Sequence, residues 1–257
     1  MGLMDGKVAV VFGVANKRSI AWGITTALAE AGAKIALNFQ NERMREGVEK
    51  LAEELAPKPF VQVCDATNTA EVKAYMAAIK EKYGHIDALV HCIASAKREE
   101  LSGNYFNTSW EGYALAQHVS AYSLVELARE AAPLMEGREG AILTLTYYGS
   151  EKVVPNYNVM GVAKAALESS VRYLANDLGP KGIRINAISA GPIKTLSAMG
   201  VADFSALLNA IAEKAPLRRN VTQEDVGHTA LFLLSEWARS ITGQVLYVDS
   251  GYCIMGA

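Results

Sequence analysis

The alternation of short β-branched runs with longer helical patterns constrains this chain more than any other feature. Seven runs rich in β-branched and other apolar residues predict strands at 7–12, 34–39, 60–63, 88–92, 141–146, 184–188 and 245–248. Between them, apolar residues recur at helical spacing and predict helices at 20–31, 44–55, 70–83, 114–135, 157–178 and 226–234. Strands that are apolar throughout, such as residues 8–12, are typical of a parallel sheet covered on both faces. The pattern therefore predicts an α/β, doubly wound fold with a seven-stranded parallel sheet and helices on both faces.

The chain contains no sign of a boundary between domains. It has 257 residues, of which 51% are hydrophobic, enough to bury a core and too many for a disordered chain. We find no linker rich in Pro or Ser, no internal repeat and no low-complexity tract in the sequence. The one irregular stretch, residues 193–215, is small and apolar and separates a predicted strand from the last predicted helix. We therefore expect a single domain spanning residues 1–257.

Charge and cysteine content exclude several classes of partner and site. The chain carries 25 basic and 27 acidic residues, so its net charge of −2 offers no long-range attraction to nucleic acid or an acidic membrane. We expect neither as a partner. No secretory signal is evident, and no uncharged run reaches the roughly 18 residues of a membrane span. Three widely separated cysteines and four histidines without ligand spacing indicate no metal site and a reducing, cytoplasmic location.

The first strand leads into a segment with some features of a nucleotide-binding loop. Gly13 follows the strand directly, and Ser19 stands at the expected start of the next helix, with Ile20 after it. A glycine there lets the backbone approach a ligand, and the N–H groups of a helix N-terminus attract a pyrophosphate. The usual G-x-G-x-x-G pattern is absent. A structural turn with Ser19 as the N-cap residue therefore remains the alternative interpretation.

Three further strand ends add polar or apolar residues at the same expected edge of the sheet. Gln40 follows the second strand, where a neutral amide can bond ribose hydroxyls, and Arg43 is near enough to keep NADPH as an alternative to NADH. Asp65 follows the third strand and suits either an adenine amino group or the N-cap of the next helix. Ile93, after the fourth strand, suits the wall of a ribose and nicotinamide site. Together these positions indicate a Rossmann-type dinucleotide-binding edge.

Tyr157 and Lys164 lie seven residues apart at the start of a predicted helix. Seven residues are about two helical turns, so the two side chains face the same way and can converge on one ligand. A lysine ammonium can lower the pKa of a neighbouring phenol and bond a ribose, while the phenol donates to an oxygen that becomes negative during reaction. The alternative is an exposed Tyr and Lys on a solvated helix face.

Three segments of the chain, residues 13–21, 155–164 and 190–196, together resemble a known enzyme family. The second of them contains Tyr157 and Lys164. The chain closely resembles the NADH-dependent enoyl-acyl carrier protein reductases of bacterial fatty-acid synthesis, a branch of the short-chain dehydrogenase/reductases. The resemblance covers nearly the whole chain. Most of that superfamily has Tyr-x3-Lys, but Met160 stands four residues before Lys164 here, and Tyr147 occupies the place of the usual serine.

The resemblance implies a role for each residue at the site. The cofactor contacts would be Gly13, Ser19, Ile20, Gln40, Asp65, Ala66, Ile93, Lys164, Ile193, Thr195, Leu196 and Ser197. The catalytic residues would be Tyr147, Tyr157 and Lys164, and the substrate contacts Ala96, Tyr147, Tyr157 and Met160. NADH would deliver a hydride to C3 of a trans-2-enoyl thioester, the last reductive step of fatty-acid elongation, and Tyr157 would stabilise the enolate. The proton for C2 would come from Tyr147 or from water relayed by Lys164.

The resemblance also implies partners and an assembly. The substrate would arrive on acyl carrier protein, and four copies of the chain would form a homotetramer. Residues 193–215 would form a lid over the acyl chain, the alternative being a packed surface helix. Because the lid tip lacks basic residues, carrier docking would use other cations, with Lys194, Lys214, Arg218 and Arg219 as candidates, or would be weaker. Two rival functions remain: a carbonyl-reducing or alcohol-oxidising dehydrogenase of the same superfamily, and a non-catalytic nucleotide-sensing regulator.

Overall fold

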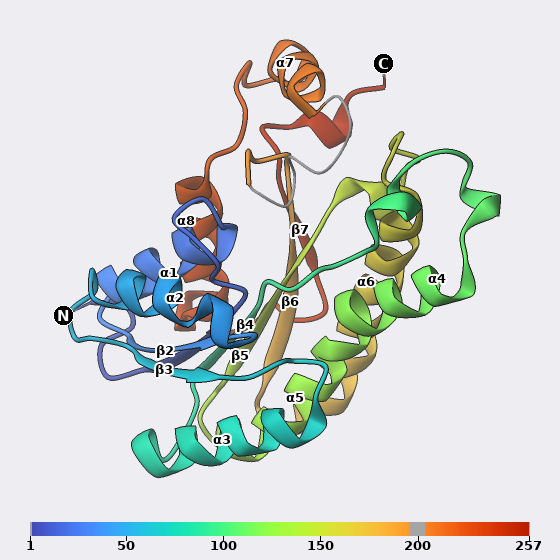
Figure 1. Ribbon diagram of the computed structural model, residues 1–257. Helices are drawn as coiled ribbons and strands as arrows, with labels where there is room; N and C mark the ends of the chain where they lie inside the picture. Colours follow the sequence, from blue (N-terminus) through green and yellow to red (C-terminus); the bar gives the residue numbers. More distant parts are fainter. Residues whose placement is uncertain (1, 196–203, 257) are drawn as a thin grey trace.

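A seven-stranded parallel sheet forms the centre of the molecule (Figure 1). The computed structural model describes residues 2–195 and 204–256. The strands lie in the order β3-β2-β1-β4-β5-β6-β7. Their bounds are β1 Val8–Phe12, β2 Lys34–Phe39, β3 Phe60–Val63, β4 Ala88–His91, β5 Ala141–Thr146, β6 Arg184–Ala190 and β7 Val245–Val248. This arrangement confirms the predicted Rossmann-type fold class.

Strand ends differ from the sequence prediction at three places. Lys7 precedes β1 instead of opening it, and Cys92 follows β4 instead of closing it. The third difference is in β6, which continues two residues beyond the predicted end because Ser189 and Ala190 pair with β7 as well as following Ile188. The carboxyl end of β6 therefore extends further toward the ligand-binding edge than predicted.

Eight α-helices are described, and they cover both faces of the sheet (Figure 1). They are α1 Ile20–Glu30, α2 Arg45–Ala52, α3 Thr69–Tyr83, α4 Trp110–Gln117, α5 Ser123–Met135, α6 Asn158–Leu178, α7 Phe204–Lys214 and α8 Gln223–Leu234. One hydrophobic core lies between the sheet and α1, α2 and α8, and a second lies between the sheet and α3, α5 and α6. Alternate side chains of β1 enter the two cores, which explains its continuous apolar run.

Four helical predictions need correction. The helix predicted at 226–234 is α8, which begins three residues earlier, at Gln223. The predicted helix 114–135 is α4 and α5 joined by a π-helical turn, His118–Tyr122, and it begins four residues earlier. The predicted helix 44–55 begins as a 3-10 turn, Glu42–Met44, and its α-helical part ends at Ala52. The stretch 193–215, expected to be irregular, contains the eleven-residue helix α7.

The topology fixes where a ligand can bind. The strand order reverses between β1 and β4, which are neighbours although two strands separate them in sequence. In open parallel sheets, ligands bind beyond the carboxyl ends of the strands at such a reversal. None of the helices described is both long and apolar enough to cross a membrane.

Candidate active site

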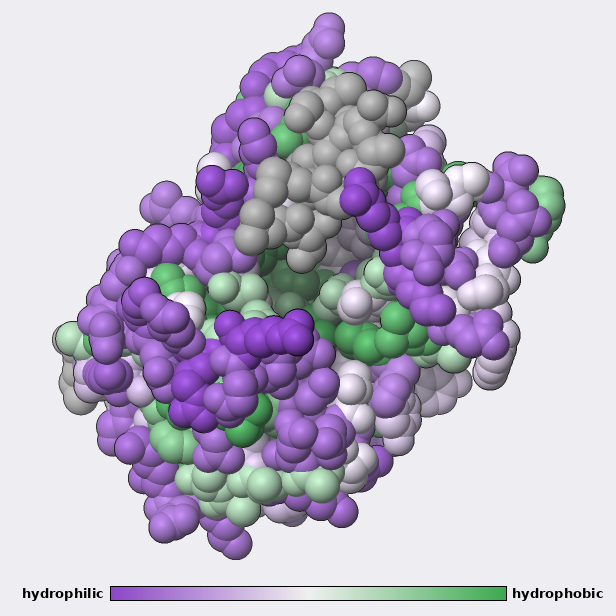
Figure 2. Space-filling model, viewed as in Figure 1, coloured by the Kyte–Doolittle hydropathy of each residue, from purple (hydrophilic) through white to green (hydrophobic). Residues whose placement is uncertain are grey.

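A cavity of about 550 Å³ opens beyond the carboxyl ends of β1, β4, β5 and β6. Figure 2 shows a hollow in the surface with hydrophobic residues on its floor. Its lining includes most of the residues expected from the sequence: Gly13, Ser19, Ile20, Ile93, Ala96, Tyr147, Tyr157, Met160, Lys164, Ile193 and Thr195. Two further expected contacts, Leu196 and Ser197, lie outside the described residues.

Glycine is required at position 13, where the loop of residues 13–19 that follows β1 crosses the end of β4. Its φ is +101°, and an added Cβ would lie 2.2 Å from the carbonyl oxygen of Cys92. Ser19 occupies the N-cap position of α1, but its hydroxyl donates to the carbonyl of Asn16 at 2.6 Å instead of capping the helix. Ser19 is thus the N-cap residue in position, as the alternative interpretation has it, but its side chain does not cap the helix. The first N–H groups of α1 stay available to an anion in the cavity.

Gln40, Asp65 and Ala66 form a separate group that lies beyond the lining of the cavity. The Gln40 amide donates to the Asp65 carboxylate at 3.1 Å, and the Thr67 backbone and hydroxyl donate to it at 2.9 and 2.7 Å. Burial alone would raise the pKa of Asp65, but these hydrogen bonds outweigh it and lower the pKa. Asn68 caps α3, so the N-cap alternative for Asp65 is wrong.

Tyr147 and Tyr157 pack edge-to-face in the cavity, with ring centroids 5.0 Å apart. Tyr147 follows β5, and Tyr157 is the residue immediately before α6. Burial raises the pKa of Tyr147 to about 12 and raises that of Tyr157 further. The expectation that Lys164 lowers the phenol pKa is wrong here, because desolvation dominates and the charges of Tyr147 and Glu168 act in the same direction. Both phenols are therefore protonated donors at neutral pH.

Lys164 is a buried ammonium at the edge of the cavity, not a residue of a solvated helix face. Only 6% of its surface is exposed, and its Nζ donates to the carbonyl of Leu145 at 2.7 Å. Burial lowers its pKa to about 8. One turn further along α6, the buried Glu168 accepts a hydrogen bond from the Thr146 hydroxyl at 2.6 Å. These two contacts fix the first half of α6 against the end of β5.

The apolar end of the site is a small cluster that includes Ala96, Tyr157 and Met160. Ser120, in the π-helical turn, contacts this end of the site. Its hydroxyl accepts from the Ser95 N–H at 3.0 Å and lies 3.7 Å from the Met160 sulfur. One buried serine, which sequence reasoning did not single out, thus joins Met160 to the residue that precedes Ala96.

The lining also contains residues that the sequence analysis did not assign to the site, among them Arg98, Leu101 and Val154. Arg98 and Leu101 belong to a 3-10 turn in the segment that directly follows Ala96, so their nearness in sequence was the available signal. His91, beneath the cavity, bonds Thr144 and Ser123 at 2.8 Å each, and burial lowers its pKa to about 3. No group of three His, Cys, Asp or Glu side chains within the described residues could hold a metal ion.

Comparison with known proteins identifies the family. A family model described as enoyl-(acyl carrier protein) reductase matches residues 13–253. The chain belongs to this enoyl-(acyl carrier protein) reductase family. It is 56% identical to the NADH enoyl-[acyl-carrier-protein] reductase FabI of Bacillus cereus, with all of both chains covered. It is 49% identical to the FabI of Aquifex aeolicus, covering 100% of this chain and 94% of the relative.

Solved structures of the enoyl-(acyl carrier protein) reductase family match the fold over the whole chain. The Bacillus cereus enzyme with NADP⁺ and indole naphthyridinone matches with a TM-score of 0.98 at 55% identity, and both chains are fully covered. The enzyme of Anaplasma phagocytophilum in complex with NAD matches with a TM-score of 0.95 at 46% identity, covering 100% of this chain and 97% of that one.

Proposed function

We propose that this protein is an NADH-dependent enoyl-acyl carrier protein reductase. It reduces the C2=C3 double bond of trans-2-enoyl thioesters in the last reductive step of fatty-acid elongation. The observation that carries this function is the meeting of Tyr147, Tyr157 and Lys164 in one cavity of a chain that belongs to the reductase family. NADH, when bound, supplies the hydride that the substrate accepts at C3.

The donor groups around the cavity fit a dinucleotide. The N-terminus of α1 with Gly13, Ser19 and Ile20 suits the pyrophosphate, because its N–H groups and helix dipole favour negative charge. Gln40, Asp65 and Ala66 suit the adenosine, and Ile93 suits a wall of the nicotinamide ribose. Ile193 and Thr195, together with Leu196 and Ser197, complete the proposed set at the carboxamide.

Lys164 and the two tyrosines have different roles in the proposed reaction. The ammonium has three donors and uses one on Leu145, which leaves two for the ribose hydroxyls. The protonated Tyr157 hydroxyl stabilises the charge that develops on the thioester oxygen when C3 accepts the hydride. Tyr147, or water relayed by Lys164, then protonates C2. Ala96 and Met160 contact the acyl chain.

We also propose how the carrier protein and the lid contribute. The chain works as one domain, and residues 193–215, which include α7, close over the acyl chain. Arg219 forms an ion pair with Asp225 at 2.7 Å, and Arg218 donates to the Glu213 carbonyl. The exposed Lys194 and Lys214 are therefore the better candidates to contact the acidic carrier. The proposed location is cytoplasmic, and the proposed assembly is a homotetramer.

The test is the consumption of NADH with a crotonyl thioester, set against the same measurement with a 3-oxoacyl thioester. We expect rapid oxidation with the crotonyl substrate only. The opposite preference would indicate a carbonyl-reducing dehydrogenase, and NADH binding without oxidation would indicate a nucleotide-sensing regulator. Repeating the assay with NADPH tests Arg43, since a well-aimed guanidinium there would bring the two cofactors to similar kcat/KM values.

A further inference from the structure

A side chain of helix α8 contacts the loop of residues 13–19, which belongs to the proposed pyrophosphate site. Gln223, the first residue of α8, directs its amide nitrogen at two carbonyl oxygens of this loop. The nitrogen lies 2.5 Å from the oxygen of Ser19 and 3.1 Å from that of Lys17. A primary amide nitrogen carries two hydrogens, so one side chain satisfies both carbonyls. This contact joins residues more than 200 positions apart in sequence.

Helices α1 and α8 approach so closely that glycine is required on both. An added Cβ on Gly23 would lie 2.7 Å from the carbonyl oxygen of Gln223, and one on Gly227 would lie 2.5 Å from the carbonyl oxygen of Gly23. The backbone at Gln223 is thus packed directly on α1. This close packing of α8 on α1 therefore fixes the distance between the side-chain amide of Gln223 and the loop.

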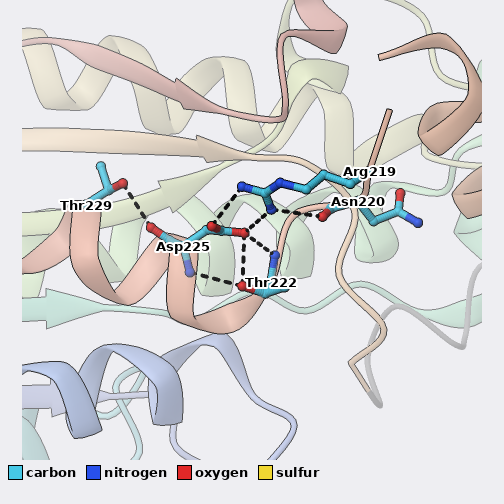
Figure 3. A network of polar contacts seen from close by, with 5 residues as sticks. All are labelled: Arg219, Asn220, Thr222, Asp225 and Thr229. Carbon is cyan, nitrogen blue, oxygen red and sulfur yellow. Dashed lines mark hydrogen bonds and ion pairs between the residues drawn. The ribbon is translucent and has the colours of Figure 1, made fainter. Parts of the chain in front are cut away.

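The first turn of α8 is fixed by a second set of polar contacts (Figure 3). Thr222 and Asp225 form a reciprocal capping box around the start of the helix. Arg219 adds a two-point contact to the Asp225 carboxylate at 2.7 and 3.1 Å. Since Gln223 lies between these residues in sequence, its backbone is held on both sides.

We propose that Gln223 is a positioning residue for the cofactor. By holding the carbonyls of Lys17 and Ser19 toward α8, it keeps these partially negative groups away from the phosphates and leaves the N–H groups at the start of α1 to the anion. Its contribution is to prepare an anion site before the dinucleotide binds. The inference rests on the proposed function, because it presumes that this loop binds the pyrophosphate of NADH.

The test replaces Gln223 with methionine, which keeps the length of the side chain and removes both donors. We expect the Kd of Gln223→Met for NADH, measured by fluorescence titration, to rise about tenfold, which corresponds to about 1.4 kcal/mol. We expect kcat at saturating NADH to stay within about twofold of the parent value, because the loop does not touch the reacting atoms. The control is Glu224→Gln, a change at the exposed next residue of the same turn, with no expected effect on Kd.

A second variant and a stability measurement separate positioning from folding. Gln223→Glu keeps the shape but places only acceptors beside the two carbonyls, so it should weaken NADH binding at least as much as Gln223→Met. A purely structural role predicts a lower Tm with an unchanged Kd for NADH, and that result overturns the inference. Equal weakening by Glu224→Gln overturns it as well. If the parent protein itself fails to bind NADH, the proposed function fails, and the inference falls with it.

Discussion

Burial shifts the pKa values of Tyr147, Tyr157 and Lys164, the three residues proposed as catalytic, and leaves each of them a donor at neutral pH. The pKa of Tyr147 rises to about 12 and that of Tyr157 rises further, so both phenols keep their protons at neutral pH. The pKa of Lys164 falls to about 8, which still leaves the ammonium charged at pH 7. Desolvation disfavours the charged form of each group, which is why acids and bases shift in opposite directions.

The proposed roles of Tyr157 and Lys164 predict different losses. Tyr157→Phe should lower kcat by about 10²- to 10³-fold, because it removes one donor to the developing enolate oxygen. Its Kd for NADH should stay near the parent value. Lys164→Met should mainly raise the Kd for NADH, because it removes the proposed ribose hydrogen bonds and keeps the apolar stem. Steady-state kinetics and NADH titration check both, and equal loss of NADH affinity in the two variants would contradict the assignment.

The pKa of Lys164 also predicts a pH dependence. The affinity for NADH should decrease above about pH 8, where the free enzyme loses the charge on this residue. Titration with NADH across pH 6–10 measures it, and Lys164→Arg, which stays charged, should remove the decrease near pH 8. An unchanged decrease in Lys164→Arg would assign it to another group.

The same shift has a consequence for stability. An unfolded lysine binds its proton up to about pH 10.4. Between about pH 8 and that value the unfolded state therefore binds more protons than the folded state. The destabilisation from Lys164 is complete below about pH 8 and is relieved as the pH rises through this window.

At the residue scale, the positions of Tyr157 and Lys164 could be predicted from the sequence, but the surroundings that shift their pKa values could not. The seven-residue spacing of Tyr157 and Lys164 on one helix brings both to the cavity, because helical geometry is local. The direction of the tyrosine pKa shift was not predictable, since it depends on packing by β5, α6 and the segments around them. Ser120 was missed for the same reason: its partners Ser95 and Met160 lie 25 and 40 residues away.

At the scale of elements, the π-helical turn between α4 and α5 is the feature that the sequence did not reveal. Apolar residues at α-helical spacing run through residues 114–135, and one extra residue in a turn changes that spacing too little to detect. Helix α7 is different, because Phe204, Leu208 and Ile211 do follow helical spacing and carried a usable signal. The π-helical turn matters because it supplies Ser120 to the loop that follows β4.

This contact predicts the effect of Ser120→Ala. The substitution leaves the Ser95 N–H without its partner and should lower the free energy of unfolding by about 1–2 kcal/mol. It should also raise the KM for the crotonyl thioester several-fold, because Ser95 is no longer held in place and the proposed substrate contact Ala96 directly follows it. The Kd for NADH should stay unchanged. Urea unfolding and steady-state kinetics measure the two effects. Ser102→Ala is the matched control, because its exposed hydroxyl reaches only the Glu99 carbonyl; equal effects would mean that the Ser120 contact is unimportant.

At the scale of the whole molecule, the fold was predictable from the sequence, but the position of a candidate surface for another chain was not. Apolar runs and helical periodicity are properties of single segments, so they predicted the sheet and both layers of helices. A hollow of about 450 Å³ between α5 and α6 instead combines residues some 40 positions apart, among them Val125, Ala166 and Leu174. Tyr173, which lines this hollow, is 74% exposed. Exposed aromatic residues beside an apolar hollow are typical of a surface that another chain covers.

We propose that the homotetramer buries this α5–α6 surface between protomers, which predicts that Tyr173→Glu disrupts the assembly. In a symmetric interface the same patch meets itself, so one substitution introduces two carboxylates. A buried charge without a partner costs several kcal/mol, so the assembly should dissociate to dimers or monomers. Light scattering should give the mass of four 27.6 kDa chains for the parent and for Lys73→Glu, an exposed charge reversal on α3. A parent of monomer mass would contradict the tetramer itself, whereas a Tyr173→Glu variant that keeps the tetramer mass would move the interface to another face.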